Sequence, residues 1–530
     1  MTLAVACTPD SGGGNESGGS TGSTGLATST STTPDPSTTD PGGTTEIGTG
    51  QDTTAGSEEG VDSTSTGAES TSTGPGCIPG EEEGCICEAD ECGVGLACED
   101  DVCVAIPCGN GMIDDGEECD DANGMDNDGC DNDCTISEGA AAIEAGGEHV
   151  CAANHFGQMK CWGNFGQGRL GYPMQGEDIG DDEVPADFGY VDVGGVVEEM
   201  ALGSDFTCVR LATDDVICWG EGQHGRLGQG NQDNLGIDEA PVDIDPISLS
   251  GTPIQIDAGD EHACAVFADG NVSCWGRNDH GQLGVPGENM IGDNELPSDV
   301  ANVNVGANVE QIAAGLDHTC ARLGGGDVLC WGRNNLGQLG VPGSESIGDN
   351  EDPATATMVM LDGEAINIDA NYNHTCVWFP TGEIQCWGEG TQGKLGYGNE
   401  DDIGDDEEVN TQTTIDLDFN PTHLATGEDH TCARLLSTGI FCWGDGDNGR
   451  LGTGSPDDVL APLMDQIDVS KAQGPGSVTA GAEFTCTRTT GSELKCWGRN
   501  NRGQLGQGAA FPTDLGDNES LSVANAIQFE

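Results

Sequence analysis

The chain has 530 residues, of which 94 are acidic and only 15 are lysine or arginine, so its formal net charge is −79. Because nucleic acids and anionic lipid headgroups are bound through lysine and arginine, this charge argues against both as partners. The chain also has 87 glycines and 25 cysteines, which predicts short strands, many turns and an oxidising compartment.

Residues 1–7, MTLAVAC, end in a short apolar run followed by Cys7. They resemble the end of a bacterial lipoprotein signal, in which such a cysteine is lipidated. The run is shorter than an export signal and has no basic start, so we expect translation to begin further upstream; the alternative is a chance cysteine. Residues 8–76 are rich in Ser, Thr, Gly and Pro and predict a disordered tether.

Two cysteine-rich segments follow. Residues 77–104 hold six cysteines and predict a small disulfide module whose pairing the spacing does not assign. Residues 105–138 hold four cysteines and the frame C-G-N-G, G-E-E-C-D-D and D-G-C. This frame resembles the myxobacterial cysteine-rich disulfide repeat of surface and secreted proteins.

The second module contains a short loop of hard oxygen donors. These are Asp120, Asp121, Asn123, Asp126 and Asp128. Clustered carboxylates and amides are ligands that Ca²⁺ requires, although the glutamate that ends an EF-hand loop is missing. The alternative is that these residues form turns between disulfides.

One unit recurs from residue 140 to residue 530. Its mark is a pair of cysteines ten positions apart, the second of which begins Cys-Trp-Gly. The seven pairs are Cys151 and Cys161, Cys208 and Cys218, Cys264 and Cys274, Cys320 and Cys330, Cys376 and Cys386, Cys432 and Cys442, and Cys486 and Cys496. Units of about this length with roughly four short strands are typical of a β-propeller.

Each cysteine pair flanks a turn sequence such as GGGD at 324–327, with alternating apolar residues on both sides. This pattern predicts a β-hairpin in which the two cysteines lie opposite each other, close enough for a disulfide. Zinc is disfavoured, because the histidine two residues before the first cysteine is Phe206 or Phe484 in two units. We therefore expect that histidine to be a buried hydrogen-bonding residue. A redox pair would need a closer spacing.

The frame A-G-x-x-H-T-C-A followed by V-x-C-W-G-x-N-x-x-G-Q-L-G resembles the regulator of chromosome condensation repeat, a family of seven-bladed propellers. The resemblance covers 140–530 and implies an all-β fold, with the small disulfide modules and the tether before it. We also expect 525–530 to continue into the segment at 143–151, so that the two chain ends share a blade and close the ring.

Two features are candidate binding residues. Trp378 lies outside the repeat pattern and is expected to be an exposed anchor. A second motif, IGDDE or IGDNE, lies in the connections between blades and should surround one face. Its aspartates are Asp181, Asp293, Asp349, Asp405 and Asp517. They could bind Ca²⁺ or a basic partner, or form Gly-Asp turns.

Eukaryotic members of the family are exchange factors for a small GTPase and bind chromatin, and another member is a secreted inhibitor protein. The charge and the paired cysteines favour the second kind of role. We expect a monomeric, non-enzymatic propeller, lipid-anchored at the outer membrane or cell surface or secreted, that binds an extracellular protein or glycan. The alternatives are an intracellular exchange factor or signalling regulator, and a calcium-dependent surface adhesin.

Overall fold

The computed structural model describes residues 96–99, 102–105 and 139–529, apart from 174–175, 288–289, 418–419, 436–438, 463–466, 468–474, 490, 511–513 and 522–524. Within the predicted six-cysteine module, β1 (Leu96–Glu99) pairs with β2 (Val102–Ala105), and Cys98 lies directly opposite Cys103. The predictions for residues 1–95 and for the four-cysteine module fall outside the described residues.

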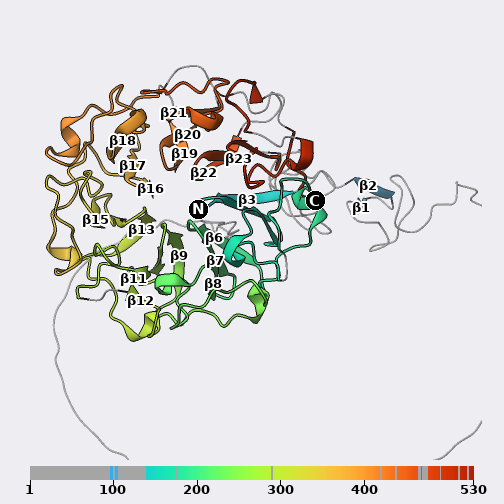
Figure 1. The fold of residues 1–530 in the computed structure, drawn as a ribbon, viewed down its shortest axis with the longest axis horizontal. Helices are drawn as coiled ribbons and strands as arrows, with labels where there is room; N and C mark the ends of the chain where they lie inside the picture. The colour runs from blue at the N-terminus through green and yellow to red at the C-terminus, as the bar shows by residue number, and fades with distance from the viewer. Residues whose placement is uncertain are drawn as a thin grey trace, which may run out of the picture. The chain divides into compact units, whose positions relative to one another are not determined.

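Seven antiparallel sheets follow one another along the chain and form a ring, as predicted (Figure 1). We number them blades 1 to 7. Blade 1 is β3 (Ala140–Ala145), β4 (His149–Asn154) and β5 (Met159–Gly163); blade 2 is β6 (Val197–Leu202), β7 (Phe206–Leu211) and β8 (Val216–Gly220); blade 3 is β9 (Pro253–Ala258), β10 (His262–Phe267), β11 (Val272–Arg277) and β12 (Met290–Ile291); blade 4 is β13 (Val309–Ala314), β14 (His318–Leu323) and β15 (Val328–Gly332).

The other three blades repeat the same order of strands. Blade 5 is β16 (Asn367–Asn371), β17 (His374–Trp378) and β18 (Ile384–Gly388); blade 6 is β19 (Pro421–Thr426), β20 (His430–Leu435) and β21 (Gly439–Gly444); blade 7 is β22 (Pro475–Ala480), β23 (Phe484–Thr489) and β24 (Leu494–Gly498). In every blade the first strand is the inner one, nearest the centre of the ring (Figure 1). The middle strand of each blade is covered by its neighbours, which is why β4, β7, β10 and β20 are buried along their whole length.

The outer edge of the blades is less regular than the four-stranded unit that the repeat predicts. Among the described residues only blade 3 has a fourth strand, β12. In blade 1 the fourth strand is reduced to two isolated bridges, Gly163 with Ile179 and Met159 with Val191. Between them the chain makes the Gly-Asp turn and the short 3₁₀ turn Pro185–Asp187, and these turns interrupt the outer strand.

The ring does not close through a shared blade, so that prediction is wrong. The C-terminal segment returns as the outer edge of its own blade, where Ile527 bridges Leu494. Blade 7 then meets blade 1 side by side: Trp162 Nε1 donates to the Gln504 carbonyl at 3.0 Å, and the ring of Phe529 lies 6.4 Å from that of Tyr190. Side-by-side packing of complete blades closes the ring.

The helical segments of the described residues are three-residue 3₁₀ turns. None of them has the length or the apolar character of a membrane-spanning helix.

Candidate functional site

All seven predicted cysteine pairs form disulfides within their own hairpins. In blade 4, Cys320 lies directly opposite Cys330 in the register of β14 and β15, and their Cα atoms are 4.0 Å apart. The fourteen sulfur-bearing side chains are at most 5% exposed. Because the sulfurs are bonded to each other, these cysteines provide no thiolate for zinc or for redox chemistry.

The recurring histidine joins neighbouring blades. His318 Nε2 lies 2.8 Å from Thr375 Oγ1 of the next blade, and His149, His262, His374 and His430 make the same contact. Where the threonine hydroxyl also donates to a carbonyl, as Thr319 does to Gln282 at 2.8 Å, its oxygen must accept from the histidine. Burial lowers the pKa of His318 to about 3, so the ring stays neutral. The expectation of a buried hydrogen-bonding histidine is confirmed.

The variable residue of G-x-L-G also connects blades, through its carbonyl. In each blade this carbonyl accepts the indole N–H of the tryptophan in the next blade, at 2.9–3.1 Å. The seven residues are Arg169, Arg226, Gln282, Gln338, Lys394, Arg450 and Gln504, and none is more than 4% exposed. The tryptophan and the G-x-L-G segment are therefore packing elements between blades.

The charged members of this set are held by carboxylates from two blades. Arg226 pairs with Glu221 of its own blade at 3.1 Å and with Glu261 of blade 3 at 2.7 Å. Lys394 is fully buried and pairs with Glu389 at 3.1 Å and with Asp429 of blade 6. A buried charge is costly unless it is paired. The cations can therefore be buried between the blades because these carboxylates pair with them.

The inner strands enclose a central cavity of about 150 Å³. Three carboxyl groups from alternate blades line it, namely Glu144, Asp257 and Asp369. Asp257 accepts the backbone N–H of Ala314 at 2.8 Å, and Asp369 accepts that of Thr426 at 2.7 Å. These side chains thus satisfy backbone donors of the next inner strand.

Burial raises the pKa of the cavity carboxyls. The pKa of Glu144 is raised to about 7 and that of Asp257 to about 8, and the charge of Asp369 contributes to both shifts. The pKa of Asp369 is itself raised by burial. Glu144 and Asp257 therefore hold protons at a pH where exposed carboxylates are ionised.

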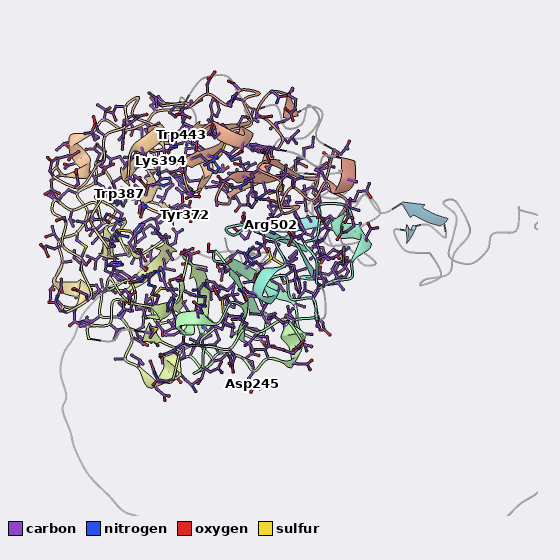
Figure 2. The ribbon with its side chains drawn as sticks, in the orientation of Figure 1. Asp245, Tyr372, Trp387, Lys394, Trp443 and Arg502 are labelled. Carbon is purple, nitrogen blue, oxygen red and sulfur yellow. A yellow bond between two sulfur atoms is a disulfide. The ribbon has the colours of Figure 1, made fainter. Side chains whose placement is uncertain are left out.

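Tyr372 stands at one mouth of the cavity, nearer the centre of the ring than Trp387 and Trp443 (Figure 2). Its backbone has φ = 43°, in the left-handed region that side chains other than glycine rarely adopt. Its side chain reaches from blade 5 to Ser204 of blade 2 and lies near Asp260 of blade 3. Tyr372 therefore spans the mouth.

The prediction that Trp378 is an exposed anchor is wrong. Its side chain is only 7% exposed, and it forms part of the cavity wall. Asn367 of the inner strand lies directly opposite it in the register of β16 and β17. The equivalent position in blades 2 and 4 holds Arg210 and Arg322, which pair with glutamates of their own inner strands.

The Gly-Asp motif lies between blades, and its glycine packs on the preceding blade. A Cβ atom at Gly348 would come within 2.6 Å of the Gly281 carbonyl oxygen, and one at Gly404 within 2.7 Å of the Gly337 carbonyl oxygen. The aspartate then caps the turn: Asp181 Oδ1 accepts the N–H of Asp182 at 2.9 Å. These contacts favour the turn interpretation over a ligand site for Asp181, Asp293, Asp349, Asp405 and Asp517.

Two of these turns gather carboxylates. Asp181, Asp182 and Glu183, and likewise Asp405, Asp406 and Glu407, have oxygens within 4.8 Å of one another. Burial, followed by the hydrogen bond to Asp406, raises the pKa of Glu407 to about 7. The donors are those that Ca²⁺ prefers. The loop predicted for Ca²⁺ at Asp120, Asp121, Asn123, Asp126 and Asp128 and the lipidation candidate Cys7 both lie outside the described residues.

Several functional candidates escaped the sequence analysis. They are the cavity carboxyl groups, the cations of G-x-L-G and Tyr372. Each of them makes contacts with residues of another blade. A signal was present for two of them: the repeat places Glu144, Asp257 and Asp369 at one equivalent position, and G-x-L-G varies only among Arg, Lys and Gln.

This ring of hydrogen-bonded blades is a seven-bladed β-propeller, and each blade contains one disulfide. Two models of the regulator of chromosome condensation (RCC1) repeat match it. One matches residues 214–266, 269–322 and 439–487, and the other 254–282, 309–338 and 477–504. The chain therefore contains RCC1 repeats within these ranges.

Two curated proteins are similar to this chain in sequence. The chain is 29% identical to the ultraviolet-B receptor UVR8 of Arabidopsis thaliana over 63% of this chain and 70% of that one. It is 34% identical to the probable E3 ubiquitin-protein ligase HERC3 of Homo sapiens over 40% of this chain, but this match spans only 19% of HERC3.

Solved structures show the same fold. Human WBSCR16 superposes with a TM-score of 0.53 at 17% identity, covering 67% of this chain and 87% of that one. Prp20p of Saccharomyces cerevisiae, described with its binding properties to Gsp1p and histones, superposes with a TM-score of 0.53 at 20% identity, covering 66% and 82%.

Proposed function

We propose that this chain is a non-catalytic binding propeller that acts outside the cytoplasm and recognises an extracellular protein. A location outside the cytoplasm is supported by the seven buried disulfides, one in every blade. Disulfides at this density form and persist in oxidising compartments and are rare where thioredoxin and glutathione keep thiols reduced.

Relatives support the binding role. UVR8 is named as a receptor, and Prp20p is described with binding properties to Gsp1p and histones. In this chain a histone-like or other basic protein surface would be attracted to the net charge of −79. A glycan is less favoured, because Phe156 is the one large aromatic side chain exposed among the described residues and sugar rings are commonly bound by exposed aromatic faces.

The cysteine count supports attachment to a membrane through lipid. Fourteen cysteines are paired in the propeller, ten belong to the two small modules, and Cys7 is the remaining one of the 25. Lipidated Cys7 followed by the tether at 8–76 would place the propeller at the cell surface or outer membrane.

Thiol counting tests the proposal against an intracellular exchange factor or signalling regulator. The native protein is isolated from its own cells and denatured in the presence of an alkylating reagent that traps free thiols. The number of alkylated cysteines is then measured by mass spectrometry. We expect at most one alkylated cysteine per chain, together with recovery in the envelope or the medium. Largely reduced cysteines and recovery in the cytosol would contradict the proposed location outside the cytoplasm.

Crosslinking tests the binding role separately. The soluble propeller is incubated with intact cells of the source organism and crosslinked, and captured proteins are compared with those captured by a reduced and denatured sample. The proposal requires a protein captured only by the folded propeller, whichever compartment the thiols indicate.

A further inference from the structure

A groove lies where blade 4 meets blade 5, and its volume is about 480 Å³. One wall is the loop at 341–347 and the following segment at 355–357, both from blade 4. Glu345 and Glu351 of blade 4 and Glu408 of blade 5 bring carboxylates into the lining. We call this feature the blade 4–5 groove.

The walls of the groove are held in place by hydrogen bonds. Asn334 is 2% exposed, and its amide donates to the carbonyls of Val341 at 3.0 Å and Gly343 at 2.7 Å. Gly343 N–H donates in turn to the Asp405 carbonyl of blade 5 at 2.8 Å. A ligand therefore meets a preformed surface, which reduces the cost of ordering on binding.

The groove is strongly acidic, and its carboxylates have no cation of their own. Glu345, Glu351 and Glu408 form no ion pair within the described part of the chain, and the buried Oε2 atom of Glu408 has no hydrogen-bond partner there. Glu408 also directly follows the crowded carboxylates of Asp405, Asp406 and Glu407. A cationic group placed here would relieve this crowding of like charges.

At two other junctions of this chain, a cationic side chain lies between carboxylates of neighbouring blades. Between blades 5 and 6 the ammonium of Lys394 lies between carboxylates of both blades, and the guanidinium of Arg226 does so between blades 2 and 3. The blade 4–5 groove likewise brings carboxylates of two blades together.

The remaining lining suits a long side chain rather than a bare ion. Val341, Ile347 and Ala356 contribute apolar surface to the groove, on which the methylene stem of lysine or arginine can lie while its charge stays with the carboxylates. The volume is also far greater than the roughly 10–15 Å³ that a single water needs.

We propose that the blade 4–5 groove binds a lysine- or arginine-bearing segment of a protein partner, with the stem against Val341 and Ile347 and the charge between Glu351 and Glu408. This rests on the proposed function of protein binding and names the chemistry of the partner.

The test uses the full chain and a fluorescently labelled nine-residue peptide with three lysines in a glycine–serine background. Its counterpart has glutamine in place of lysine. We expect the lysine peptide to bind at low salt and the glutamine peptide to bind at least about tenfold more weakly, by fluorescence anisotropy. The triple variant Glu345→Gln, Glu351→Gln, Glu408→Gln should lose at least about tenfold in affinity for the lysine peptide.

The matched control removes the same charge from exposed positions outside the groove, with Asp238→Asn, Asp245→Asn and Glu364→Gln. It should change the affinity less than about threefold. Equal losses in the two triple variants would mean that the peptide follows net charge, and the proposal would fall. It would also fall if calorimetry showed that Ca²⁺ alone binds at these three glutamates while the peptide binds both triple variants equally.

The two proposals fail in different ways. If the groove variant still captures the partner found by crosslinking to cells, protein binding stands and the groove is not its contact. If crosslinking captures nothing while the lysine peptide discriminates the two triple variants, the groove stands and the proposed function is overturned.

Discussion

At the scale of single residues, the histidine that joins blades varies together with its partner. Five blades place a histidine against a threonine of the next blade. Where the histidine is replaced by Phe206, the partner position in blade 3 is Ala263, and where it is Phe484, the partner position in blade 1 is Val150. Each junction therefore holds a polar pair or an apolar pair, so a buried histidine Nε2 faces a threonine hydroxyl rather than an apolar side chain.

The first prediction concerns this pairing at the junction of blades 3 and 4. Thr319→Ala leaves His262 Nε2 buried without its partner and should lower the free energy of unfolding by about 1–3 kcal/mol. Adding His262→Phe recreates the pair of Phe206 and Ala263 and should recover most of this loss. Denaturant midpoints of the oxidised wild type, both single variants and the double variant measure the coupling. Strictly additive effects would contradict it.

At the scale of the blade, the hairpin could be predicted because its information is local. The turn sequence and the spacing of Cys320 and Cys330 set the register of β14 and β15 without reference to any other blade. The same holds for the other six pairs. A disulfide across such a hairpin restricts the unfolded chain.

The second prediction follows from that restriction. Replacing both Cys320 and Cys330 with alanine should lower the free energy of unfolding by about 2–3 kcal/mol, as expected for closing a loop of about eleven residues. The native structure should remain, since Trp331 still donates to the Gln282 carbonyl. Equilibrium unfolding of the variant against the oxidised wild type measures the loss. A variant as stable as the wild type would show that the hairpin is already ordered when the chain is unfolded.

Contacts between blades could not be predicted in the same way. The sequence gives no distance between Tyr372 of blade 5 and Ser204 of blade 2, which meet only because the ring closes. The expected ring closure is wrong, because 525–530 does not continue into blade 1 and Ile527 forms the outer edge of blade 7. Trp378 breaks the repeat, which predicts a surface position, but its side chain is buried in the wall of the central cavity. Propeller periodicity describes one blade, and these features depend on several.

At the scale of the whole molecule, burial has opposite effects on the pKa values of two groups of residues, the cavity carboxyls and the histidines between blades. Burial raises the pKa of Glu144 to about 7 and that of Asp257 to about 8, so the folded state holds their protons above the pH at which the unfolded chain releases them. This contribution to stability is present at low pH and is lost as pH rises through 7 and 8. Burial lowers the pKa of His262 and His318 to about 3, so their contribution is present above about 6.5 and is lost as pH falls.

The third prediction combines these signs with the overall charge. As pH falls from 8.5 to 7.5 the cavity carboxyls begin to take up protons, while the histidines stay largely neutral in both the folded and the unfolded chain, so the melting temperature should rise. Measuring in about 0.5 M NaCl screens the repulsion among exposed carboxylates and leaves the effect of the enclosed cavity. Glu144→Gln with Asp257→Asn should flatten the rise, whereas Asp238→Asn with Asp245→Asn should preserve it. A melting temperature that falls over this range, or an identical slope in both double variants, would show that the cavity carboxyls do not govern the response.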